Sequence, residues 1–185
     1  LRHLPSDFSI STTDLFEATY ILGHLQTFKL DDSVEHQKVQ FKNRYGITGV
    51  GDLYMPKNAR GKLPALVLSG PFGAVKEQSS GLHAQEMAKR GFVALAFDPS
   101  FTGESSGEVR DVASPEIFSE DFSAAVDFLG LQSFVDRERI GILAICGLTG
   151  MGITAASADS RIKAVAVTAM YDMSRSITKG HQDYY

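Results

Sequence analysis

The sequence predicts an α/β fold in which a mostly parallel central sheet carries helices on both faces and is opened by an antiparallel hairpin. From Leu63 onward, short apolar runs alternate with segments whose apolar residues recur at helical spacing. The runs are continuously apolar, which is typical of parallel strands buried on both faces. Before them, Val34–Phe41 and Ile47–Met55 flank the turn Asn43–Gly46, a pattern typical of a hairpin.

The remaining elements follow from the same two patterns. The predicted parallel strands are Leu63–Leu68, Phe92–Phe97, Ile140–Ile145 and Arg161–Met170. The predicted helices between them are Ser79–Arg90, residues 115–130 and Ile153–Ala158. This order places Leu143 and Val165 in adjacent central strands.

Two segments make up the predicted domain organisation. Residues 1–33 are expected to form a lead-in with a peripheral helix over Thr13–Gln26, where apolar residues share one helical face. Residues 34–185 are expected to form a single α/β domain, because no internal repeat or linker interrupts them.

Composition limits the classes of function. Of the 185 residues 43% are hydrophobic and 22% charged, and the net charge is -4, which does not favour binding to nucleic acid or to an anionic membrane. No apolar run is long enough to span a bilayer. A single cysteine excludes an internal disulfide and a cysteine-based metal site. We expect a cytoplasmic protein without a metal or cofactor.

The stretch Arg139–Gly152 holds the main candidate for chemistry. An apolar strand ends at Cys146, and glycines and a predicted helix follow. Strand, tight turn with one nucleophilic side chain, and helix is the arrangement of a nucleophile elbow, in which the helix N-terminus stabilises negative charge. A lone cysteine is more often a small buried hydrophobic residue, and the pattern leaves both interpretations of Cys146 open.

Four segments together carry a resemblance to a known family. They are Pro71–Gln78, Asp98–Gly107, Arg139–Gly147 and Arg161–Val165. With them, residues 38 to 175 resemble the α/β-hydrolase superfamily, and within it the bacterial branch related to dienelactone hydrolases and xylan esterases. The resemblance implies an α/β-hydrolase-type three-layer fold.

The resemblance also implies roles for particular residues. Cys146 takes the place of the nucleophile, the backbone N–H of Gly147 is one oxyanion donor, and the N–H of Phe72 or Gly73 is the second, with Phe72 preferred. The expected reaction is hydrolysis of a small carboxylic ester, lactone or thioester by the cysteine of a nucleophile elbow. The alternative is a non-catalytic or truncated protein of the same fold with a binding role only.

The chain departs from the family pattern in two respects. Leu148 and Thr149 follow the nucleophile position where relatives carry smaller residues. In this fold the catalytic acid and histidine follow the seventh and eighth strands, and the sequence suggests neither strand. We therefore expect the C-terminal part of the fold to be missing, and an oligomer partner or second chain to cover the edge of the sixth strand. His181 is interpreted as part of a solvated tail.

Five other residues have less specific interpretations. His83 is expected on a helix, facing outward or packing locally. Ser105 and Ser106 lie in the family's Gly-Glu-Ser loop, where the serine is structural. Lys76 and Glu77 could line the site, although Glu77 at a helix start is explained by the helix dipole.

Overall fold

The computed structural model describes residues 26–170 and 172–179. The predicted helix over Thr13–Gln26, apart from its last residue, and the tail residue His181 lie outside the described residues. Gln26–Ser33 run along the domain, where the N–H of Thr27 donates to the carbonyl of Glu77 at 3.0 Å.

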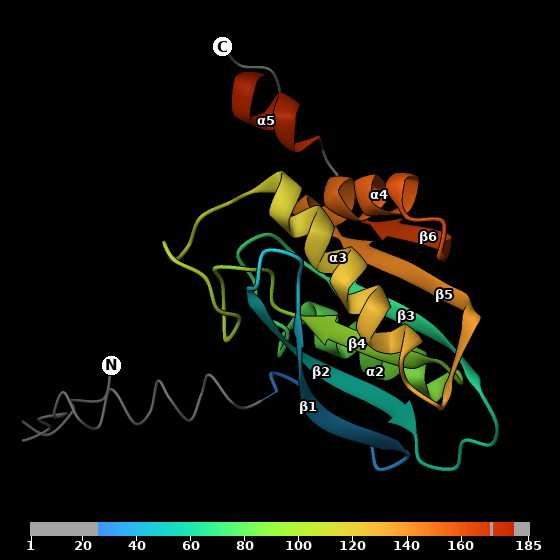
Figure 1. Ribbon diagram of the computed structural model, residues 1–185. Helices are drawn as coiled ribbons and strands as arrows, with labels where there is room; N and C mark the ends of the chain where they lie inside the picture. The colour runs from blue at the N-terminus through green and yellow to red at the C-terminus, as the bar shows by residue number, and fades with distance from the viewer. Residues whose placement is uncertain (1–25, 171, 180–185) are drawn as a thin grey trace, which may run out of the picture.

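Within the described residues, six strands form one mixed sheet (Figure 1), in the order β1-β2-β4-β3-β5-β6. The strands β1 and β2 are antiparallel, as are β2 and β4, whereas β3 is parallel to β4 and β5, and β5 to β6. The predicted hairpin and parallel sheet are therefore confirmed. The strands are β1 Val34–Lys42, β2 Thr48–Pro56, β3 Leu63–Ser69, β4 Val93–Phe97, β5 Val135–Ile145 and β6 Ile162–Thr168.

Helices cover both faces of the sheet. Figure 1 shows α3 in front of the sheet and α2 behind it, and α4 packs beside α3. The face under α3 and α4 holds the larger core, in which Phe122 of α3 meets Phe97 of β4 edge to face at 5.2 Å. The face under α2 holds a smaller core built around Tyr54 and Leu68. The helices are α2 Ser79–Lys89, α3 Pro115–Gly130, α4 Thr149–Ala158 and α5 Met173–Lys179.

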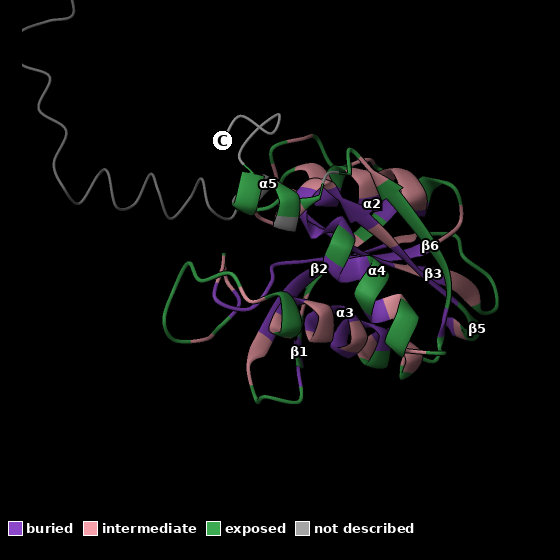
Figure 2. Ribbon diagram, turned by 90° about the horizontal axis from the view of Figure 1, so that it is seen from above, coloured by how far each residue is buried: buried purple, intermediate pink, exposed green. Residues whose placement is uncertain are grey.

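One prediction about strand position is half wrong. Residues of β5 and β6 do pair, with Leu143 opposite Ala166 and Ile142 opposite Val165. Among the described strands, however, β6 is the edge of the sheet and is not central. Its residues are largely exposed (Figure 2), including Val165 at 40% and Val167 at 41%. That an oligomer partner or second chain covers this edge stays a prediction.

No helix in the described ranges is long and apolar enough to cross a membrane.

Candidate active site

Cys146 lies at the junction between β5 and α4. The inner half of β5 is apolar and buried because it runs between β3 and β6 under α3 and α4. The strand ends at Ile145, a short 3₁₀ turn covers Cys146–Leu148, and α4 begins at Thr149. Cys146 has a φ of +57°, a left-handed conformation that non-glycine residues adopt uncommonly. Its side chain is partly exposed, unlike the buried Ile145 and Leu148 beside it.

The two residues that depart from the family pattern after Cys146 are both buried in the fold. Leu148 is buried in the larger core. Thr149 is also buried, and its hydroxyl donates to the carbonyl of Cys146 at 2.7 Å. The close crossing is made by Gly152, where an added Cβ would lie 2.8 Å from the Cβ of Ala144. A small residue is therefore needed at position 152 and not at 148 or 149.

The loop after β3 lies against the residue that precedes Cys146. A Cβ added to Gly70, which has a φ of +104°, would lie 2.2 Å from the carbonyl oxygen of Ile145. Phe72 follows two positions later and is 41% exposed. Among the described residues no acceptor is recorded for the Phe72 N–H. The N–H of Gly147 belongs to the first turn of the helix that follows β5, where backbone donors lack an intrahelical acceptor.

The same loop ends in a buried cluster of charges. The ammonium of Lys76, fully buried, lies 2.5 Å from Oε1 of Glu77, 3.2 Å from Oδ2 of Asp98 and 2.5 Å from Oε2 of Glu104. The carboxylate of Glu104 also pairs with the ammonium of Lys38 at 2.7 Å. Glu77 lies two residues before α2, which begins at Ser79 as predicted, and its carboxylate is also held by the ammonium of Lys76.

The four charged side chains of this cluster all have shifted pKa values, because one buried ammonium faces three carboxylates. Burial disfavours the charged form of Lys76, but Asp98, Glu104 and Glu77 outweigh it and raise the pKa of Lys76. Burial raises the pKa of Asp98 and of Glu77 against the opposing effect of the Lys76 ammonium, and the negative charge of Asp98 raises that of Glu77 further. Burial also acts on Glu104, but bonds from Lys38 and Lys76 lower its pKa.

The serines of the Gly-Glu-Ser loop form structural hydrogen bonds, as expected. The hydroxyl of Ser105 accepts from the N–H of Val50 at 2.9 Å and donates to the carbonyl of Asp98 at 2.6 Å. The hydroxyl of Ser106 accepts from the N–H of Thr48 at 2.9 Å. Both serines thereby tie the loop after β4 to β2.

The two histidines in the described ranges have partners away from Cys146. His83, half-buried on α2, contacts the carbonyl of Ser79 through Nδ1 at 2.8 Å, as local packing predicted. His36 on β1 lies 3.3 Å from Oδ1 of Asp52. In the described part of the chain no group of three or more His, Cys, Asp or Glu side chains could hold a metal ion.

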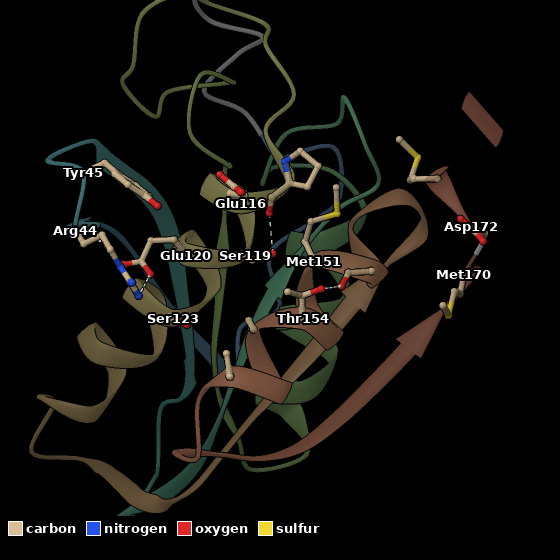
Figure 3. A pocket seen from close by; sticks show the side chains of 15 residues that line it. Arg44, Tyr45, Glu116, Ser119, Glu120, Ser123, Met151, Thr154, Met170 and Asp172 are labelled. Carbon is tan, nitrogen blue, oxygen red and sulfur yellow. Dashed lines mark hydrogen bonds and ion pairs between the residues drawn. The ribbon is translucent and has the colours of Figure 1, made fainter. Parts of the chain in front are cut away.

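A pocket of about 730 Å³ lies on the α3 and α4 side of the molecule (Figure 3). It runs between the faces of these two helices, and Met151 and Met170 contribute apolar side chains. Cys146 does not line it. The pocket is lined by Arg44, Tyr45, Pro115, Glu116, Ser119, Glu120, Ser123, Gly150, Met151, Thr154, Ala155, Ala158, Met170, Asp172 and Met173.

Comparison of the sequence with known families gives one match over most of the chain. Residues 50–182 match the family described as X-Pro dipeptidyl-peptidase (S15 family). The chain is 62% identical over 159 residues to the protein PA2218 of Pseudomonas aeruginosa, and 35% identical over 137 residues to the thiohydrolase aneE of Aspergillus aculeatus. These alignments cover 85% and 74% of the chain but only 43% and 42% of the relatives. The chain thus spans less than half the length of either relative.

Solved structures give the same fold. The crystal structure of PA2218 has a TM-score of 0.84 and covers 86% of this chain and 50% of its own. A dienelactone hydrolase-like phosphotriesterase from metagenomic libraries has a TM-score of 0.63 at 19% identity, covering 75% of this chain and 60% of its own. The fold is therefore that of the α/β hydrolases, as the sequence predicted.

Proposed function

We propose that this chain, which belongs to the X-Pro dipeptidyl-peptidase (S15) family, carries the nucleophile and the oxyanion donors of a hydrolase for small carboxylic esters, lactones or thioesters. Cys146 is the proposed nucleophile. The observation that carries the proposal is its φ of +57° at the junction of β5 and α4. A nucleophile elbow holds its side chain in such a strained turn between strand and helix.

The proposed reaction begins with attack on the substrate carbonyl. The thiolate of Cys146 forms a bond to the carbonyl carbon, and the carbonyl oxygen becomes an oxyanion. The N–H groups of Gly147 and Phe72 are the proposed donors to it, and each such donor is worth about 10²–10³ in rate. Collapse of the intermediate breaks the bond from the carbonyl carbon to the leaving oxygen or sulfur, which departs as an alkoxide that takes a proton from water or as a thiolate, and leaves a thioester on Cys146, which water then hydrolyses.

Two further observations support a hydrolytic thiol. The partial exposure of Cys146 gives a substrate access that a wholly buried cysteine would lack. A relative with 35% identity carries the name thiohydrolase, which supports a hydrolytic reaction and the inclusion of thioesters among the substrates.

The described residues supply no base to Cys146, and this sets the expected kinetics. Neither His36 nor His83 contacts it in the ranges described. Without a base, water attacks the acyl-enzyme slowly. We expect the 185-residue chain to release at most one equivalent of product in a burst and then to turn over poorly.

The test is a time course of p-nitrophenyl acetate hydrolysis at several concentrations of the chain. The burst amplitude should scale with chain concentration and disappear in Cys146→Ala, and peptide mass spectrometry should locate the acetyl group on Cys146. Turnover that Cys146→Ala leaves intact would place the chemistry elsewhere. Sustained turnover abolished by His181→Ala would make that residue the base. No burst and no labelling would favour the alternative, a protein with a binding role only.

A further inference from the structure

The fully buried ammonium of Lys76 has no part in the proposed reaction. Removing a lysine ammonium from water costs several kcal/mol, and charged pairs in a protein interior are often no more stabilising than apolar residues of similar volume. Stability alone is therefore a weak explanation for a lysine held by Glu77, Asp98 and Glu104. The cluster does, however, connect the loop after β3 to the loop after β4.

Lys76 joins the loop after β3 to the loop after β4 in two ways. Its ammonium contacts Asp98 and Glu104, which are 22 and 28 residues further along the chain. Its backbone N–H donates to Oδ1 of Asp98 at 2.7 Å. Asp98 in turn accepts from the N–H of Glu104 at 3.0 Å, so that the second loop is folded around the same carboxylate.

The other end of the β3 loop is also fixed. The hydroxyl of Ser69 donates to the carbonyl of Phe97 at 2.9 Å, and Gly70 lies against the carbonyl of Ile145. Phe72 lies between this anchor and Lys76. The position of its N–H relative to Cys146 therefore depends on both anchors.

We propose that Lys76 is a positioning residue whose buried ammonium holds the loop after β3 so that the N–H of Phe72 faces the oxyanion formed at Cys146. The inference rests on the proposed function and names a residue that the reaction scheme leaves out. Lys76 contacts neither substrate nor thiol and acts through the loop alone.

Two reactions of the same thiol separate this role from a general effect on folding. Acylation by p-nitrophenyl acetate forms an S–C bond, passes through an oxyanion and releases p-nitrophenolate. Alkylation by iodoacetamide forms an S–C bond and releases iodide, and no oxyanion develops. A misplaced oxyanion donor lowers the first rate and leaves the second unchanged, whereas unfolding or altered access changes both. The readout is the ratio of the acylation rate to the alkylation rate.

The main variant is Lys76→Met, which is unbranched, reaches as far as the ε position and removes the charge. If it does not fold, Lys76→Met combined with Asp98→Asn replaces it. This pair of substitutions leaves the net charge of the cluster unchanged, and the amide oxygen introduced at position 98 can still accept the backbone N–H of Lys76, although the bond from the N–H of Glu104 is lost. The matched control is Asp121→Asn. Asp121 on α3 is also buried and accepts from the N–H of Ser100 at 2.8 Å, so it holds the loop after β4, but it has no hydrogen bond to the loop after β3 that carries Phe72.

We expect Lys76→Met to lower the ratio by about a hundredfold, the effect of misplacing a catalytic group by about 1 Å, and Asp121→Asn to leave it near the wild-type value. If the folded Lys76 variant keeps a ratio of acylation to alkylation rate within tenfold of wild type, or if Asp121→Asn lowers this ratio equally, the role of Lys76 is overturned while the proposed function stands. Absence of any acylation that depends on Cys146 in the wild-type chain overturns the proposed function, and this inference with it.

Discussion

Gly70→Ala tests the contact between the loop after β3 and the end of β5. Gly70 has a φ of +104°, and an alanine Cβ there would lie 2.2 Å from the carbonyl oxygen of Ile145. A carbon and a carbonyl oxygen ordinarily stay about 3.3 Å apart. The loop, which carries Phe72, or the strand end, which carries Cys146, must therefore move by about 1 Å, because the atom that is met is backbone and cannot rotate away.

The expected loss of stability has two parts. A left-handed φ costs an L-residue about 1–2 kcal/mol. Forcing a methyl group into packed atoms costs about 1–3 kcal/mol. Gly70→Ala should thus lower the free energy of unfolding by about 2–5 kcal/mol. A displacement of about 1 Å should also slow acylation of Cys146 by about a hundredfold.

Gly91→Ala is the matched control. Gly91 follows α2 and has a φ of +94°, but nothing lies within 4 Å of an added Cβ. This substitution should cost only the backbone strain, about 1–2 kcal/mol, and leave acylation unchanged. Urea unfolding measures the stability of both variants, and the burst rate with p-nitrophenyl acetate measures acylation. Equal stability losses in the two variants, or a normal burst in Gly70→Ala, would refute the reasoning.

Three further substitutions test the fold. Phe122→Ala should lower the free energy of unfolding in urea by about 3–5 kcal/mol, because the buried ring packs edge to face on Phe97; a loss below about 1 kcal/mol would contradict this packing. Ser114→Ala removes the N-cap of α3 and should cost about 1 kcal/mol, with faster hydrogen exchange in the first turn. Unchanged exchange there would argue against the cap. For Asp31, hydrogen bonds from Ser33 lower the pKa from 3.8 to about 2, so the stabilisation present above pH 3.8 is lost as the pH falls through about 2. The stability difference between wild type and Asp31→Asn should shrink over that range, and a difference independent of pH would contradict the assignment.

Local pattern was enough to predict most elements. The strand at Ile140–Ile145 was predictable because a strand buried on both faces is continuously apolar in sequence. The helix at residues 115–130 was predictable because its apolar residues recur at helical spacing. The start of α4 was predicted four residues late, at Ile153 instead of Thr149, because Gly150 and Gly152 weaken helix propensity. The structure gives the reason for Gly152, which lets the helix cross close to Ala144.

Two conflicting expectations for the position of β6 followed from the sequence: its apolar run favours a central strand, whereas the lack of a suggested seventh strand predicts an uncovered edge. The apolar run of β6 is typical of a buried strand, yet Val165 and Val167 are exposed at the edge of the described sheet. An apolar run indicates only that a strand can be buried. Which neighbouring strands cover it depends on pairing between segments that are distant in the sequence.

The sequence by itself determined the fold class and the candidate nucleophile, because the strand, Cys146 and the glycines after it are adjacent in the chain and their geometry is local. The burial and the partners of Lys76 were decided by the tertiary structure. Its partners Asp98 and Glu104 are distant in sequence, and a lysine beside a glutamate is ordinarily read as a solvated pair. Only the folding of β4 beside β3 brings the two loops together and places Asp98 and Glu104 beside the ammonium, where together with Glu77 they offset the cost of burying it.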